Sequence, residues 1–126
     1  MKEDTILVVD DDKSSCEFLA EFLRSNGFNV LTADRAEEGI GVMEDNRVDL
    51  IISDYFMPEM DGLEFLGEIK ARHPGLPFIL LTAFGTIEKA VDAIKFGAVD
   101  YVQKSSDLEG LLLIAKQAIR LHIWCG

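Results

Sequence analysis

The chain has 126 residues, 48% hydrophobic and 28% charged, which is typical of one globular domain and excludes a disordered chain. Twelve Lys and Arg residues stand against 23 Asp and Glu residues, giving a net charge of -11. Because phosphate backbones and anionic lipids repel such a chain, we expect it to bind neither nucleic acid nor membranes directly.

The two cysteines, Cys16 and Cys125, form no disulfide framework and no metal-ligand spacing. Residues 1–4 lead directly into an apolar run, so no signal peptide is expected, and no apolar stretch has the length of a membrane span. These features predict a cytoplasmic protein.

Five apolar runs predict strands over residues 6–9, 28–33, 48–53, 78–82 and 99–103. Segments with helical spacing separate and follow them. This alternation predicts an α/β fold in which helices cover both faces of a parallel sheet. We find no repeat or linker, so residues 1–126 are interpreted as one domain. The abrupt end of the last helical run suggests a segment cut from a longer chain.

Apolar spacing also predicts which helix residues face the sheet. The first helix is expected to end at Asn26–Gly27, while Gly39 and Gly41 weaken the prediction of the second. A capping box over residues 106–109 opens the fifth. The expected stripes are Ser15, Phe18, Leu19, Phe22 and Leu23; Ala36, Ile40 and Met43; Ile87, Val91 and Ile94; and Leu108, Leu112, Ala115 and Ile119. The third helix is expected to contain Leu63, Leu66, Ile69 and Lys70 and to stop before His73.

Acidic residues follow the first and third apolar runs. The first run ends in Asp10, Asp11 and Asp12, and the third ends in Asp54. In open α/β sheets ligands bind beyond the carboxyl ends of the strands. Two carboxylates about 4 Å apart repel by roughly 4 kcal/mol at an effective dielectric near 20, so a hard divalent cation such as Mg²⁺ is expected to compensate. Asp12 is explained better as the N-cap of the first helix.

The fourth run ends at Thr82, and Lys104 follows the fifth. Alone, each is an ordinary strand or loop residue. With the carboxylates and a cation at the same sheet edge, a hydroxyl and an ammonium group suit a phosphoryl group, whose charge they would neutralise.

Four segments together resemble the receiver domain of two-component response regulators, similar to the chemotaxis-type single-domain receivers. They are residues 6–12 (ILVVDDD), 54–62 (DYFMPEMDG), 81–83 (LTA) and 97–104 (GAVDYVQK). The resemblance covers essentially the whole chain, and it implies a flavodoxin-like (βα)5 fold with strand order 2-1-3-4-5. The longer chain that the abrupt end suggests would then be a regulator or a hybrid kinase.

By this resemblance Asp54 is the phosphoacceptor. It would take a phosphoryl group from a sensor histidine kinase or a histidine phosphotransfer domain. The implied Mg²⁺ ligands are Asp54, Asp11, Asp10 (directly or through water) and the backbone carbonyl of Phe56, and Mn²⁺ can replace Mg²⁺.

Thr82 and Lys104 would contact the phosphoryl group, and Tyr101 would be the aromatic residue that turns inward upon switching. The implied output surface comprises the fourth helix, the fifth strand and the fifth helix, which could also pair two copies in a homodimer. The resemblance implies self-phosphorylation and autodephosphorylation rather than turnover of a separate substrate, so the domain is not expected to be an enzyme.

The chain departs from the family pattern at Ser105, where proline usually follows the lysine through a cis peptide bond. A cis bond before a non-proline residue costs about 2.5–4 kcal/mol, so we expect a trans Lys104–Ser105 bond or a strained cis bond. Phe56 and Phe84 occupy positions that shape water access in the family, and we hypothesise that they slow hydrolysis of the phosphoryl group.

Three alternatives remain. A degenerate receiver would act as an interaction domain without phosphorylation. An aspartyl-phosphate phosphatase would need a second acid where Phe56 stands. A flavin carrier of the same fold would need a phosphate-binding loop where the chain has three aspartates.

Overall fold

The computed structural model describes residues 4–55, 57–82, 91–92, 95, 100–103 and 108–125, with the backbone alone described at 82, 100–103 and 121–125. The elements are β1 (Thr5–Val9), α1 (Lys13–Ser25), β2 (Asn29–Ala33), α2 (Ala36–Asp45), β3 (Leu50–Asp54), α3 (Gly62–Arg72), β4 (Phe78–Thr82), β5 (Asp100–Gln103) and α5 (Leu108–Cys125). All five expected strands are present, close to their expected bounds. Within these ranges, no helix combines the length and apolarity that crossing a membrane requires.

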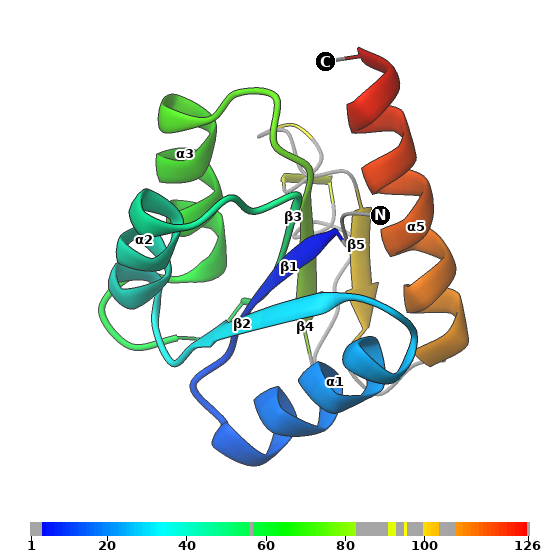
Figure 1. The fold of residues 1–126 in the computed structure, drawn as a ribbon. Helices are drawn as coiled ribbons and strands as arrows, with labels where there is room; N and C mark the ends of the chain where they lie inside the picture. The colour runs from blue at the N-terminus through cyan, green and yellow to red at the C-terminus, as the bar shows by residue number, and fades with distance from the viewer. Residues whose placement is uncertain are drawn as a thin grey trace.

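The strands form one parallel sheet in the order β2-β1-β3-β4-β5. Helices α2 and α3 cover one face, and α1 and α5 cover the other (Figure 1). The flavodoxin-like α/β fold and its strand order are therefore confirmed. The order places β1 beside β3 in the interior of the sheet, so the residues that follow these two strands emerge next to each other.

Both faces of the central strands β1, β3 and β4 are buried, which explains why these strands are mostly apolar. Along β1, Ile6 and Val8 belong to the cluster beneath α1 and α5, whereas Leu7 and Val9 belong to the cluster beneath α2 and α3. All four side chains are at most 1% exposed. Burial on both sides requires a helix on each face for every central strand, and this requirement fixes the layered architecture.

Helix α1 buries Leu19 and Leu23 as expected, but the prediction for Phe18 is wrong. Phe18 was expected to face inward, but it is 63% exposed, whereas Cys16 and Ala20 are buried beside Leu19 and Leu23. The Cys16 thiol lies 3.9 Å from the carbonyl oxygen of Val8. Small side chains at the contact let the helix approach β1 closely, and the bulky aromatic ring is thereby turned outward.

Helix α2 contains two glycines that differ in their surroundings. A Cβ atom on Gly39 would lie 3.2 Å from the Phe65 ring and 3.2 Å from a Val9 methyl group. No atom lies within 4 Å of the corresponding position on Gly41, which is exposed. Gly39 therefore permits close packing of α2 against the sheet and α3, while Gly41 has no such role.

The side chain of Asp49 stabilises the amino-terminal edge of the sheet. Its carboxylate accepts a hydrogen bond from the Thr5 N–H at 2.9 Å and lies 3.4 Å from the Arg47 guanidinium. Burial raises the pKa of the nearby Asp4 above its ordinary value of 3.8, and the Asp49 charge raises it further, while Arg47 opposes the shift.

Three expectations about the fold lie wholly or partly outside the described residues. Of the expected fourth helix, only Val91, Asp92 and Lys95 are described, and their backbone is helical. Val91 was expected to belong to the inward stripe, but it is 44% exposed. The capping box that opens α5 and the Lys104–Ser105 peptide bond are the other two.

The two glycines of α2 provide a test of packing. We expect Gly41→Ala to raise the free energy of unfolding by about 0.5–1 kcal/mol, because alanine loses less backbone entropy in a helix. Gly39→Ala should gain less or lose stability, because the new methyl group crowds Phe65 and Val9. Urea denaturation of both variants measures the difference, and equal gains would contradict the packing role of Gly39.

Asp4→Asn should stabilise the protein at pH 7. Because the folded-state pKa of Asp4 is raised, ionisation of this carboxyl destabilises the fold at neutral pH. The penalty fades as the pH falls through the folded-state pKa and is absent below the unfolded value of 3.8. Thermal melts from pH 7 to pH 3 should therefore show a variant advantage that shrinks upon acidification. A stability advantage of Asp4→Asn that grows at low pH would contradict this prediction.

Candidate functional site

Three carboxylates converge at the carboxyl edge of the sheet. Asp10 follows β1 and Asp54 ends β3, and the register pairs Val9 with Ser53, so the two acids emerge side by side. One oxygen from each of Asp10, Asp11 and Asp54 lies within 4.8 Å of the others. Asp10 and Asp54 are only 4% and 7% exposed, whereas Asp11 is open to solvent. The expected convergence of these acids is therefore present in the structure.

Backbone hydrogen bonds orient the two buried carboxylates. Asp10 Oδ1 accepts a bond from the N–H of Asp12, and Asp54 Oδ1 accepts one from the N–H of Tyr55, each at 2.9 Å. Carboxylates at this spacing repel by roughly 3 kcal/mol at an effective dielectric near 20. An all-oxygen set with one open side suits a hard divalent cation, which would offset that repulsion. The cluster could thus hold a metal ion.

Asp12 serves α1 instead of this cluster. Its carboxylate accepts bonds from the N–H groups of Ser14 and Ser15, at 3.1 and 3.3 Å, and from the Ser15 hydroxyl at 3.1 Å. It is the N-cap that the sequence favoured, and the structure confirms that interpretation.

The remaining predicted residues are described only in part. Thr82 ends β4 one residue beyond Leu81, the partner of Asp54, so its backbone lies at the same sheet edge. Gln103 pairs with Thr82, and Lys104 follows Gln103 in the chain. Tyr101 lies within β5. The side chains of Thr82 and Tyr101 are not described, and residues 56, 84 and 104 lie outside the described ranges.

Two features next to Asp54 were missed from the sequence. Asp61 and Glu64 form a capping box that starts α3. The Asp61 carboxylate accepts a hydrogen bond from the Glu64 N–H at 2.9 Å, and the Glu64 carboxylate accepts one from the Asp61 N–H at 3.3 Å. Their acid-to-glutamate spacing could have revealed it. Ser53, which was interpreted only as a strand residue, is completely buried and carries a hydroxyl. No spacing rule would have singled it out.

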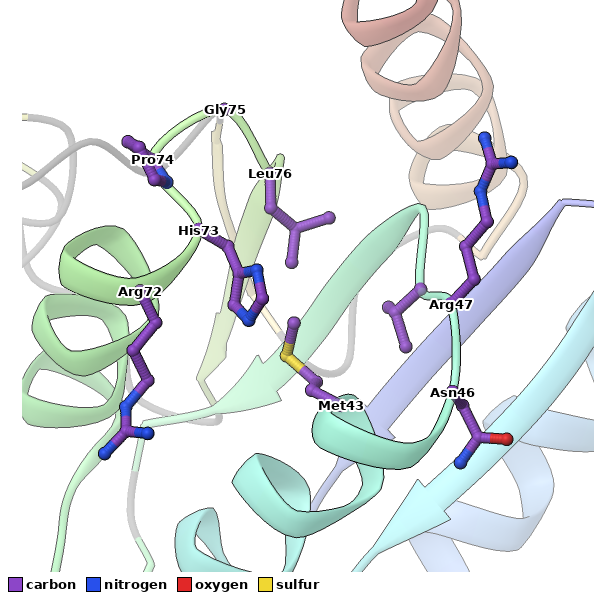
Figure 2. A pocket seen from close by; sticks show the side chains of 9 residues that line it. Met43, Asn46, Arg47, Arg72, His73, Pro74, Gly75 and Leu76 are labelled. Carbon is purple, nitrogen blue, oxygen red and sulfur yellow. The ribbon is translucent and has the colours of Figure 1, made fainter.

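A hollow of about 450 Å³ lies at the opposite, amino-terminal edge of the sheet, between the ends of α2 and α3. Figure 2 shows Arg47 and Arg72 extending in different directions, with His73 directed toward Met43. Arg72 lies 3.6 Å from Glu44 and 3.7 Å from Glu68. Because its arginines are engaged by carboxylates and do not converge, this hollow is a weaker candidate site than the acidic cluster.

A family model described as "Response regulator receiver domain" matches residues 6–116. The transcriptional regulatory protein ZraR of Escherichia coli (strain K12) is 40% identical over 114 residues, covering 90% of this chain and 26% of that protein. The response regulator protein FleR of Pseudomonas aeruginosa is 39% identical over 115 residues, covering 90% and 24%. The chain thus spans about a quarter of the length of these curated relatives.

Solved structures of receiver domains also superpose closely on this chain. A response regulator receiver domain protein from Clostridium thermocellum superposes with a TM-score of 0.92 at 31% identity, covering 98% of this chain and 99% of that one. The receiver domain of NtrX from Brucella abortus gives a TM-score of 0.87 at 35% identity, covering 91% and 98%. With its fold, strand order and sequence all in agreement, the chain belongs to the response regulator receiver domain family.

Proposed function

We propose that this receiver domain accepts a phosphoryl group on Asp54 in a Mg²⁺-dependent reaction. The observation that carries the proposal is the convergence of Asp10, Asp11 and Asp54 at the carboxyl edge of the sheet. An ionised carboxylate needs no general base to act as a nucleophile, but it does need alignment and charge neutralisation. The cluster supplies an aligned carboxylate and a ligand set for the neutralising ion.

In the proposed reaction an Asp54 oxygen attacks the phosphorus of a phosphohistidine on the donor. The new P–O bond forms as the P–N bond breaks, and the imidazole leaves with the bond's electron pair. Asp10, Asp11, Asp54 and the carbonyl of Phe56 would hold Mg²⁺, or Mn²⁺ in its place. The bound ion would neutralise charge on the transferred group.

Thr82 and Lys104 are proposed to contact the phosphoryl group, and Tyr101 to report its presence by turning inward. The backbone of Thr82 lies at the correct edge, and Lys104 follows a residue paired with it. The fourth helix, β5 and α5 would then form the surface that changes, and a local charge change would bias its two states. We propose that Ser105, in place of the usual proline, alters how Lys104 approaches the phosphoryl group.

The proposed partner is a sensor histidine kinase or a histidine phosphotransfer domain in the cytoplasm. A homodimer through the fourth helix, β5 and α5 is a further proposal. Residues 1–126 would form one receiver domain of a longer regulator or hybrid kinase. The domain would phosphorylate and dephosphorylate itself without turning over separate substrates, and any contact with DNA would belong to other residues because this segment has a net charge of -11.

Asp54→Asn should abolish phosphorylation. We expect wild type incubated with acetyl phosphate and Mg²⁺ to gain the mass of one phosphoryl group, and to gain none when the ion is chelated. Asp12→Asn is the matched control, because asparagine also caps helices and Asp12 lies outside the cluster. Intact mass spectrometry measures the adduct. An unmodified wild type would favour the degenerate receiver, and an equal adduct on Asp54→Asn would place the phosphoryl group elsewhere.

Phe56→Asn and Phe84→Glu should each shorten the lifetime of the phosphoryl group. A polar side chain at either position is expected to admit or hold the attacking water, which the aromatic ring would exclude. Loss of the adduct is followed after the donor is removed, with Phe18→Asn, an exposed phenylalanine on α1, as the control. Lifetimes equal to that of wild type would refute the shielding role.

A further inference from the structure

Ser53 lies one residue before Asp54 and is 0% exposed. In the sheet it pairs with Val9 on β1 and with Leu80 on β4. A hydroxyl buried among apolar neighbours costs free energy unless it makes a hydrogen bond. Alanine would fill nearly the same space without that cost, so the hydrogen bonds that this hydroxyl makes are needed to explain a serine at this position.

The hydroxyl reaches two acceptors in the chain that follows it. Its oxygen lies 3.0 Å from the backbone carbonyl oxygen of Asp54 and 3.9 Å from the sulfur of Met57. A hydroxyl has one proton, so the two acceptors share or alternate in receiving it. Both belong to the segment by which the chain leaves β3, so this hydroxyl links the end of the strand to the loop beyond it.

Other contacts hold the backbone of Asp54 and Tyr55 from different directions. The N–H of Tyr55 is shared between Asp54 Oδ1 and the carbonyl of Leu81, which lies 2.8 Å from it. The carbonyl of Tyr55 accepts from the N–H of Gly62 at 2.7 Å. A Cβ atom on Gly62 would lie 2.7 Å from the Asp54 carbonyl oxygen and 2.9 Å from the Tyr55 Cα atom. Strand β4 and the start of α3 therefore confine the backbone of Asp54 and Tyr55, and Ser53 adds a hydrogen bond to the Asp54 carbonyl.

Successive side chains on a strand point to opposite faces, so the Ser53 hydroxyl does not lie among the carboxylates. We propose that Ser53 is a positioning residue, whose hydroxyl holds the Asp54 carbonyl and the Met57 thioether so that the Asp54 carboxylate and the loop after it keep their metal-binding geometry. The inference rests on the proposed function. It assigns to Ser53 a role that acts through its neighbours and involves no contact with the phosphoryl group.

The test compares Ser53→Ala with Ser25→Ala. Ser25 also donates from its hydroxyl to a backbone carbonyl, that of Phe22 at 2.7 Å, but it is exposed at the end of α1. Titration calorimetry with Mg²⁺ alone should show binding weakened roughly threefold to tenfold in Ser53→Ala, the equivalent of one lost hydrogen bond, and unchanged in Ser25→Ala.

A second measurement needs no metal. With methionine methyl groups labelled for NMR, the Met57 signal of the ion-free protein should shift in Ser53→Ala and stay in place in Ser25→Ala. Met57→Leu removes the sulfur acceptor. Combined with Ser53→Ala, it should weaken Mg²⁺ binding by less than the product of the two single effects.

Ser53→Cys keeps a weak donor and should recover part of the lost affinity, and it replaces Ser53→Ala in the comparison if the alanine variant does not fold. Wild type that fails to bind Mg²⁺ would overturn the proposed function and this inference together. Wild-type binding that Ser53→Ala leaves unchanged, with an unmoved Met57 signal, would overturn this inference alone.

Discussion

The parallel pairing of β1 with β3 is the constraint on which the site depends. It brings Asp10 and Asp54 out of the sheet side by side, although 43 residues separate them in the chain. Because both strands are buried on both faces, neither can slide by one residue without turning its apolar side chains to the wrong layer. The register that forms the core therefore also sets the spacing of the carboxylates.

This arrangement gathers three carboxylates at one edge of the sheet, where their like charges repel one another. Asp10 and Asp54 are buried, and Asp11 completes a set of oxygens within 4.8 Å. Fixed N–H groups orient the buried pair. In the proposed reaction, a bound cation would relieve the repulsion and a phosphoryl group would alter the charge again, which would couple the charge state of this edge to the surrounding loops.

The loop after Asp54 shows how packing and chemistry share the same atoms. Gly62 starts α3 so close to the Asp54–Tyr55 peptide that no side chain fits between them. The capping box of Asp61 and Glu64 then fixes where that helix begins. Stability of α3 and orientation of the site are thus linked, and a change made for one will affect the other.

The residue order alone predicted the five strands and the carboxylate set, because apolar runs mark buried parallel strands and acids at their ends meet at one edge. Only the tertiary structure decided that Cys16 is buried in α1 and Phe18 is not, because both are apolar and close contact with β1 selects the smaller. The role of Ser53 was likewise invisible in the sequence. A hydrogen bond depends on where a carbonyl points, and the folded chain alone sets that direction.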